Sequence, residues 1–286
     1  PALKAGRGAG YRGPSELPVG TPTMTSFADF SRDARRLFAG WKWRASYLLG
    51  TPVPAHYDDE LRATIKRVRR YTLTSAARIA ALCDAVEYVV RNGIEGDFVE
   101  CGVWKGGSVM AAALTLQRLG DTSRDLYLFD TFSGMPQPGE QDVSSAYDGY
   151  SLHRRWKRHN QTGTEWAGVP VERVRANVES TGYPRERIHC VKGMVEDTLP
   201  GEAPEKLAIL RLDTDWYSST KHELETLYPR LAEGGVLIVD DYGHYEGARR
   251  AVDEYFAETG QRVLLSRIDY TGRIAVKQGV GVPATA

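Results

Sequence analysis

The fold is decided by residues Asp97–Ser108, which read DFVECGVWKGGS. An apolar run ends at Cys101, a glycine-rich turn follows, and apolar residues then return at helical spacing after Gly107. Glycines let the backbone approach a ligand closely, and the start of a helix favours an anionic group. The stretch therefore predicts a strand, a ligand-binding turn and a helix, although an ordinary glycine-rich strand–helix turn fits the same residues.

Strand-like and helix-like runs alternate along the rest of the chain. Strands are expected at Asp97–Cys101, Asp125–Phe129, Ile188–Lys192, Leu207–Leu212, Val236–Val239, Val263–Leu265 and Ile274–Val276. Helices are expected at Asp58–Arg70, after an N-cap at Ser75, and at Gly107–Leu119, Val171–Ser180, Ser219–Leu231 and Glu246–Thr259. This alternation predicts a mostly parallel α/β sheet with helices on both faces. The turn at Tyr270–Gly272 is too short for a parallel crossover, so at least one of the last two strands should run antiparallel.

Composition restricts the classes of function. The 286 residues are 42% hydrophobic and 26% charged, with 37 basic and 37 acidic residues, which excludes global disorder and disfavours a strongly basic nucleic-acid binder. No run is apolar over the roughly 20 residues that a bilayer span needs, and we find no signal-peptide pattern. Three cysteines without a Cys-x-x-Cys pair argue against a disulfide framework or a zinc site and favour a reducing cytoplasm.

Three segments are expected along the chain. Residues 1–25 are rich in Gly and Pro and should form a flexible tail, and residues 26–70 should form an N-terminal helical extension. The extension begins with a helix at 27–49, whose apolar face could pack on a second copy of the chain or on its own domain. Residues 71–286 should form the main domain, with a mobile lid at 131–169 where the alternation is interrupted.

Asp130 is expected at the end of the strand that follows the glycine-rich turn. A carboxylate at that place can accept hydrogen bonds from both hydroxyls of a ribose, as in nucleotide-binding sheets. A strand-terminal Asp that caps a turn is equally compatible with the sequence.

Two other strands end in pairs of carboxylates. Asp213 and Asp215 follow the strand at Leu207–Leu212, and Asp240 and Asp241 follow the next strand. Parallel strands place their C-terminal ends side by side, so the four groups should gather at the edge where open α/β sheets bind ligands. Such carboxylates repel one another at low dielectric, and a hard divalent cation such as Mg²⁺ would relieve the repulsion. The alternative is two unrelated Asp pairs that cap helices.

Basic and histidine side chains give weaker signals. The expected lid contains four basic residues between 154 and 158, which would attract an anionic acceptor or simply face solvent. His244 follows Asp241 closely enough to lie near the site, whereas His222 is expected to be solvated on a helix.

Further motifs resemble those of a known family. They are Phe129–Pro136 (FDTFSGMP), Glu196–Pro200 (EDTLP), Leu212–Asp215 (LDTD), Tyr228–Leu231 (YPRL) and Asp240–Gly243 (DDYG). Together with the glycine-rich turn they closely resemble the macrocin O-methyltransferase family, which methylates sugars of antibiotics, over about residues 71–277. The resemblance implies a class I, Rossmann-like methyltransferase fold with seven strands, one of them antiparallel. It also implies the cofactors S-adenosyl-L-methionine (SAM) and Mg²⁺.

The resemblance also implies roles for individual residues. The implied metal ligands are Asp213, Asp240 and Asp241, and the implied general base is Asp215. The implied cofactor-binding residues are Glu100, Gly102 and Ser108 at the methionine end of SAM, Asp130 at the ribose, Ser133 after it, and Thr74 in a segment that closes over the SAM carboxylate. The chain departs from the family pattern at Met135 and at His244–Tyr245, which leaves the lining on the acceptor side open.

The expected activity is therefore SAM- and Mg-dependent O-methylation of a sugar hydroxyl in antibiotic biosynthesis. The sugar would be either nucleotide-activated or part of a glycosylated natural product. A catechol-type O-methyltransferase is the alternative, because an aromatic vicinal diol also chelates Mg²⁺. A binding module has no need of four converging carboxylates, and the glycine spacing does not match the G-x-G-x-x-G of NAD enzymes. We expect a cytoplasmic homo-oligomer with a small-molecule acceptor and neither a nucleic-acid nor a membrane partner.

Overall fold

The computed structural model describes residues 53–143, 151–161 and 167–279. The expected tail at 1–25 and the expected helix at 27–49 lie outside these residues, as do two parts of the expected lid. No helix within the described residues is both long and apolar enough to cross a membrane.

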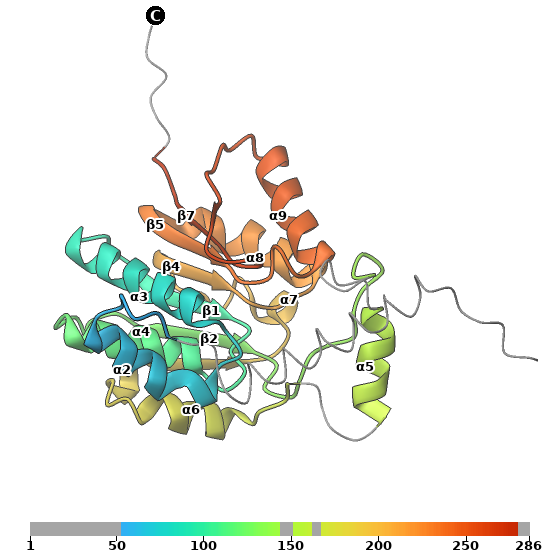
Figure 1. Ribbon diagram of the computed structural model, residues 1–286. Helices are drawn as coiled ribbons and strands as arrows, with labels where there is room; N and C mark the ends of the chain where they lie inside the picture. Colours follow the sequence, from blue (N-terminus) through green and yellow to red (C-terminus); the bar gives the residue numbers. More distant parts are fainter. Residues whose placement is uncertain (1–52, 144–150, 162–166, 280–286) are drawn as a thin grey trace, which may run out of the picture. The chain divides into compact units, whose positions relative to one another are not determined.

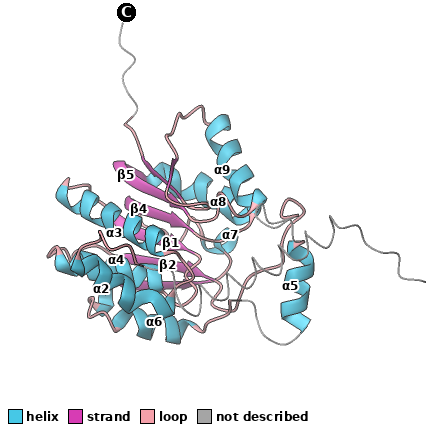
Figure 2. Ribbon diagram, in the orientation of Figure 1, coloured by secondary structure: helices cyan, strands magenta, loops and turns pink. Residues whose placement is uncertain are grey.

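A seven-stranded sheet forms the centre of the described chain (Figures 1 and 2). Its strands are β1 (Asp97–Cys101), β2 (Leu126–Asp130), β3 (Ile188–Lys192), β4 (Leu207–Leu212), β5 (Leu231–Val239), β6 (Ser266–Arg267) and β7 (Arg273–Val276). They lie in the order β3-β2-β1-β4-β5-β7-β6. Strand β7 pairs antiparallel with β5 and β6, and the other neighbouring pairs are parallel. The predicted mixed sheet with one antiparallel strand is confirmed.

The bounds of β2 and β7 differ from the prediction by one residue, and two other strands differ by more. Strand β5 begins at Leu231 instead of Val236, because Leu231 already pairs with Leu207 across a register shift. The strand expected at Val263–Leu265 is wrong, since β6 follows that run. The apolar side chains of Val263 and Leu265 pack against the core instead, without pairing to the sheet.

Helices cover both faces of the sheet (Figure 2). One layer contains α2 (Asp59–Val68), α3 (Ala76–Arg91), α4 (Gly107–Arg118) and α6 (Val171–Glu179). The other contains α7 (Val195–Thr198), α8 (Tyr217–Leu227) and α9 (Glu246–Glu258). Single 3₁₀ turns occur at Arg69–Tyr71, Arg185–Arg187 and Tyr228–Arg230. The helices predicted within the described residues are confirmed with changes of up to four residues at their ends.

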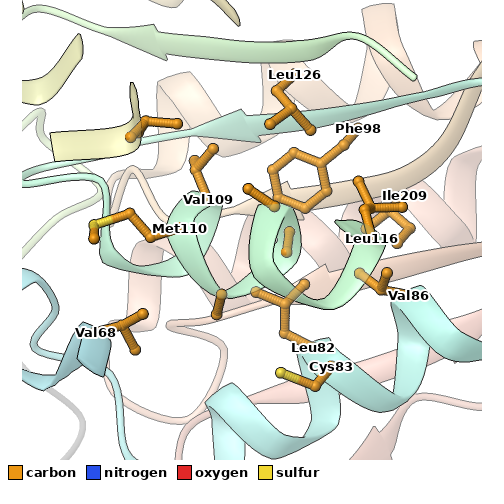
Figure 3. Packing of buried hydrophobic residues seen from close by; sticks show 14 of the residues in the cluster. Val68, Leu82, Cys83, Val86, Phe98, Val109, Met110, Leu116, Leu126 and Ile209 are labelled. Carbon is orange, nitrogen blue, oxygen red and sulfur yellow. The ribbon is translucent and has the colours of Figure 1, made fainter. Parts of the chain in front are cut away.

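Alternating residues of the strands build two separate cores. Phe98 of β1, Leu126 of β2 and Ile209 of β4 pack against the α3 and α4 side chains (Figure 3). The intervening residues, such as Val99 and Leu210, pack against α8 and α9. This two-sided burial is why the central strands are mostly apolar.

Helix starts agree with the capping signals in the sequence. The Ser75 hydroxyl accepts the backbone N–H of Arg78 at 3.2 Å, so the predicted N-cap of α3 is confirmed. Helix α2 lies within the expected N-terminal extension, yet its residues Ile65 and Val68 are buried in the core beside α4. This helix is therefore an integral part of the main domain.

The expected lid is more regular than the sequence indicates. Residues Leu152–Gln161 form helix α5, which carries the basic run. Only Leu152 and Trp156 are large and apolar within this helix, so the sequence shows little helical periodicity. Leu152 is buried against Trp216 and Tyr245, which ties the helix to the end of the sheet where the acidic residues lie.

Candidate active site

Three carboxylates converge at the C-terminal ends of β4 and β5. Asp213, Asp215 and Asp241 each offer one oxygen, and these oxygens lie within 4.8 Å of one another. Oδ2 of Asp241 is buried and has no hydrogen-bond partner among the described residues. Carboxylate oxygens are the ligands that Mg²⁺ prefers, so this set fits a hard divalent cation.

Asp240, which was expected among the ligands, is not part of this group of three, although it lies next to Asp213. Its Oδ1 accepts Nη2 of Arg211 at 2.5 Å, and its Oδ2 forms an ion pair with Arg78. Burial alone would raise the pKa of Asp240, but the two guanidinium charges outweigh it and the pKa is lowered. In this structure Asp240 is thus a paired anion, and Asp215 completes the triplet in its place.

The triplet carboxylates have perturbed acidities. Burial and repulsion from Asp213 and Asp240 raise the pKa of Asp215 to about 7. Burial and neighbouring carboxylates likewise raise the pKa values of Asp213 and Asp241 well above the usual range. A cation bound between the three groups would remove this repulsion.

Strained backbone surrounds the same sheet edge. Trp104 follows β1, Phe132 follows β2 and Asp215 follows β4, and their φ angles are 49°, 50° and 70°. Non-glycine residues rarely adopt such left-handed conformations, which cluster at functional sites. The surrounding fold therefore holds each of these three loops in a strained backbone conformation.

The glycine-rich turn brings Glu100, Gly102 and Ser108 to this edge. Glu100 is buried, its Oε1 accepts Nη1 of Arg211 at 2.6 Å, and its Oε2 has no partner among the described residues. Burial raises the pKa of Glu100 to about 7 despite that arginine. Ser108 is buried in the first turn of α4. The Glu100 carboxylate suits a cationic group, and the N-terminus of α4 beside it suits an anionic group.

Asp130 holds the turn in place through its carboxylate. Its Oδ2 accepts the backbone N–H groups of Val103 at 2.7 Å and Trp104 at 3.0 Å, and its Oδ1 accepts that of Phe132 at 2.7 Å. The turn-capping alternative is therefore present in the structure, and contact with a ribose stays a prediction. Ser133 is exposed beside it.

Thr74 and Ser75 join the segment before α3 to the site. The Thr74 hydroxyl accepts Nη2 of Arg211 at 3.0 Å, while the Ser75 hydroxyl donates to Asp269 at 2.7 Å. Asp269 also pairs with Arg78 at 3.1 Å. The segment expected to close over the cofactor is thus attached to the network that holds Asp240.

The base of the lid is fastened by residues that the sequence analysis missed. Asp142 is buried, and its Oδ1 accepts the N–H of Tyr217, the first residue of α8, at 2.9 Å. The indole N–H of Trp216 donates to the carbonyl oxygen of Pro136 at 3.1 Å. That of Trp156 in α5 donates to the carbonyl oxygen of Met135 at 3.0 Å. The lid is therefore anchored directly beside Asp215.

The histidines differ in their surroundings. His222 is half-buried on α8, with Nε2 3.4 Å from the carbonyl oxygen of Leu199, so the expectation that it is solvated is wrong. His244 packs edge-on against Tyr245 and Tyr270 near the acidic group. Aromatic rings therefore line this part of the site, where the sequence departs from the family pattern.

Comparison with known proteins agrees with this geometry. Residues 45–276 match the macrocin O-methyltransferase (TylF) family. The 8-demethyl-8-(2,3-dimethoxy-alpha-L-rhamnosyl)-tetracenomycin-C 4'-O-methyltransferase of Streptomyces olivaceus is 39% identical over 222 residues, which cover 76% of this chain and 81% of that protein. The demethyldecarbamoylnovobiocin O-methyltransferase of Streptomyces niveus is 33% identical over 224 residues, which cover 76% of this chain and 82% of that protein.

A solved structure supports the same assignment. The O-methyltransferase NovP superimposes with a TM-score of 0.65 at 29% identity, covering 85% of this chain and 99% of NovP. The predicted class I methyltransferase fold is confirmed, and the match extends over almost all described residues. The chain therefore belongs to the macrocin O-methyltransferase family and is an O-methyltransferase.

Proposed function

We propose that this protein transfers the methyl group of SAM to a sugar hydroxyl of a glycosylated natural product, with a divalent cation in the site. The observation that carries the proposal is the convergence of Asp213, Asp215 and Asp241 beside the glycine-rich turn. Methyl transfer needs a methyl donor and an acceptor oxygen aligned at short distance. The turn after β1 would hold the donor, and the carboxylate triplet after β4 and β5 would hold the acceptor.

The donor would lie along the turn after β1. Glu100 would bind the ammonium group at the methionine end of SAM, and Ser108 and Thr74 would border the SAM carboxylate. Gly102, which has no side chain, would let the backbone of the turn approach this end of SAM closely. Asp130 fixes the turn through Val103 and Trp104 and would face the ribose, with Ser133 at its side. When bound, SAM supplies an electrophilic methyl group on a positively charged sulfur.

The acceptor would lie over the carboxylate triplet. Asp213 and Asp241 would hold the cation, and Asp240 would have to release Arg78 or Arg211 to join them. When bound, Mg²⁺ lowers the pKa of a coordinated hydroxyl and orients it. Asp215 lies within reach of this position and would take the hydroxyl proton as the general base.

The names of the relatives favour a finished glycoside over a nucleotide sugar. The Streptomyces olivaceus enzyme is named for a rhamnosyl group already attached to tetracenomycin C. The lid of this chain has Trp156 and aromatic neighbours as well as basic residues, which suits an acceptor with an apolar aglycone. The homo-oligomer and the cytoplasmic location stay predictions, and light scattering in solution tests the first.

A turnover panel tests the proposal. Purified protein with SAM and Mg²⁺ is offered rhamnosylated polyketides, nucleotide-activated deoxysugars and catechols, and products are detected by the mass gain of one methyl group. We expect methylation of the glycosides. Turnover of catechols alone would replace the proposal with the catechol alternative, and turnover of nucleotide sugars alone would change the acceptor. Asp215→Asn should keep SAM binding and lose rate, so an unchanged rate would remove Asp215 as the base.

A further inference from the structure

Arg211 is a buried charge in an apolar strand. Strand β4 reads LAILRL, all six residues are buried, and the Arg211 side chain is only 2% exposed. An arginine in such a place is costly unless each of its donors has a partner. Arg211 pairs in register with Glu100 on β1 and points to the same face of the sheet as Ile209.

The guanidinium group makes four hydrogen bonds with its two terminal nitrogens. Nη1 donates to Glu100 Oε1 at 2.6 Å and to Asp213 Oδ2 at 2.7 Å. Nη2 donates to Thr74 Oγ1 at 3.0 Å and to Asp240 Oδ1 at 2.5 Å. The two N–H bonds on each terminal nitrogen are thereby all used.

These partners belong to both halves of the site. Glu100 and Thr74 lie on the side assigned to the cofactor, and Asp213 lies in the carboxylate triplet. We propose that Arg211 is a positioning residue that sets the geometry of the cofactor side against the metal and acceptor side. The inference rests on the proposed function, because only that function gives the two sides their roles.

The planar shape of the side chain is what the role requires. A guanidinium presents its donors in a fixed fork, so four acceptors bonded to it have fixed mutual positions. A lysine keeps the charge but offers three donors from one nitrogen atom and cannot reproduce the fork. Arg78 secures the arrangement from the other side, since it binds the second oxygen of Asp240 and also Asp269.

A purely structural role predicts a different outcome. If Arg211 served only to neutralise buried carboxylates, a lysine that folds would restore function. If it sets geometry, the lysine variant keeps the fold and loses alignment, and misplacement by about 1 Å can cost about 100-fold in rate.

The test compares Arg211→Lys with Arg124→Lys. Arg124 is also largely buried and donates to Asp121 at 2.7 Å and to the Gly96 carbonyl oxygen at 2.6 Å, but it lies beside the opposite ends of the strands. Circular dichroism reports the fold, steady-state kinetics give kcat and KM, and calorimetry gives the affinities for SAM and Mg²⁺. For Arg211→Lys we expect kcat to fall about 100-fold with SAM affinity within about threefold, and Mg²⁺ affinity to fall about tenfold because Asp213 is no longer fixed. Arg124→Lys should match the wild type.

A pair of variants at Thr74 covers the case in which Arg211→Lys does not fold. Thr74→Ser keeps the hydroxyl that Arg211 contacts, and Thr74→Val replaces it with a methyl group of similar volume. Because Thr74 also borders the position of the SAM carboxylate, kcat is compared at saturating SAM, and we expect it to be about tenfold lower for the valine than for the serine. Equal kcat in both Thr74 variants, or wild-type kcat and Mg²⁺ affinity in a folded Arg211→Lys, would overturn the inference alone. A wild type that neither binds Mg²⁺ nor transfers methyl would overturn the proposed function, and the inference with it.

Discussion

Gly102 and Asp213 lie so close together that a Cβ atom on residue 102 would be 2.1 Å from the carbonyl oxygen of Asp213. The φ angle of Gly102 is 82°, which side chains rarely adopt. The turn after β1 and the loop after β4 are therefore in direct backbone contact. The positions assigned to donor and acceptor are adjacent because of this contact.

Gly102→Ala should separate these two loops. Overpacking against backbone and a strained φ together should lower the free energy of unfolding by about 2–4 kcal/mol. We expect methyl transfer to be lost even where the variant is folded. Chemical denaturation and an activity assay measure the two effects. Gly201→Ala is the control, because its added Cβ would meet only an ordinary contact at 3.7 Å. A Gly102→Ala enzyme as active as this control would show that the backbone contact is dispensable.

Asp130→Ala should weaken SAM binding by releasing the glycine-rich turn. Three backbone N–H groups lose a charged acceptor, and such bonds contribute about 1.5–3 kcal/mol each in favourable cases, so we expect at least about a tenfold loss of affinity by calorimetry. Asp121→Ala is a matched control, because Asp121 caps a turn at Ser123 away from the site. Equal SAM affinity in the two variants would refute the role of Asp130.

SAM binding should strengthen as pH rises through neutrality. The pKa of Glu100 is raised to about 7 by burial, so below that pH the carboxyl is protonated in the free protein. An ammonium group favours the ionised carboxylate, and binding at low pH must first release the proton. We expect affinity about tenfold greater at about pH 8 than at about pH 6. Glu100→Gln should bind more weakly with a flat profile, and a flat profile for the wild type would contradict this role of Glu100.

Asp142→Ala should loosen the lid without changing the cofactor site. The variant removes the acceptor for the first N–H of α8, which should lower the free energy of unfolding by about 1–2 kcal/mol. Because Trp216 and α5 pack beside this anchor, KM for the acceptor should rise while SAM affinity stays constant. Asp253→Ala, which removes only an exposed bond to Tyr242, is the control. A rise in the SAM dissociation constant with unchanged KM for the acceptor would show that Asp142 supports the cofactor site and not the lid.

The sequence predicts most of the fold and the identity of the acidic residues, for local reasons. Strands β1, β3 and β4 are bounded by turn or charged residues, so their limits follow from the apolar runs themselves. Asp213 directly follows β4 and Asp241 lies two residues after β5. The parallel pairing of these strands brings both residues to one edge of the sheet.

What the sequence could not predict depends on distant contacts. The carboxylate of Asp240 is paired with Arg78, which lies 162 residues earlier in the chain, and nothing near Asp240 in the sequence indicates this partner. The sequence marks Arg211 as a single charge in an otherwise apolar strand. Its four partners come from four segments of the chain, so the sequence does not identify them. Helix α5 was missed because its helicity is supported by packing of Leu152 on Trp216 more than by its own pattern.

The dependence of methyl transfer on a divalent cation tests the central claim most directly. Initial rates are measured with SAM and a glycoside acceptor in EDTA, and again after excess Mg²⁺ is added back. The account predicts that activity is lost in EDTA and returns with Mg²⁺, and that Asp213→Asn does not recover at the same Mg²⁺ concentration. Full turnover in EDTA would contradict the claim that Asp213 and Asp241 hold a cation that the reaction uses.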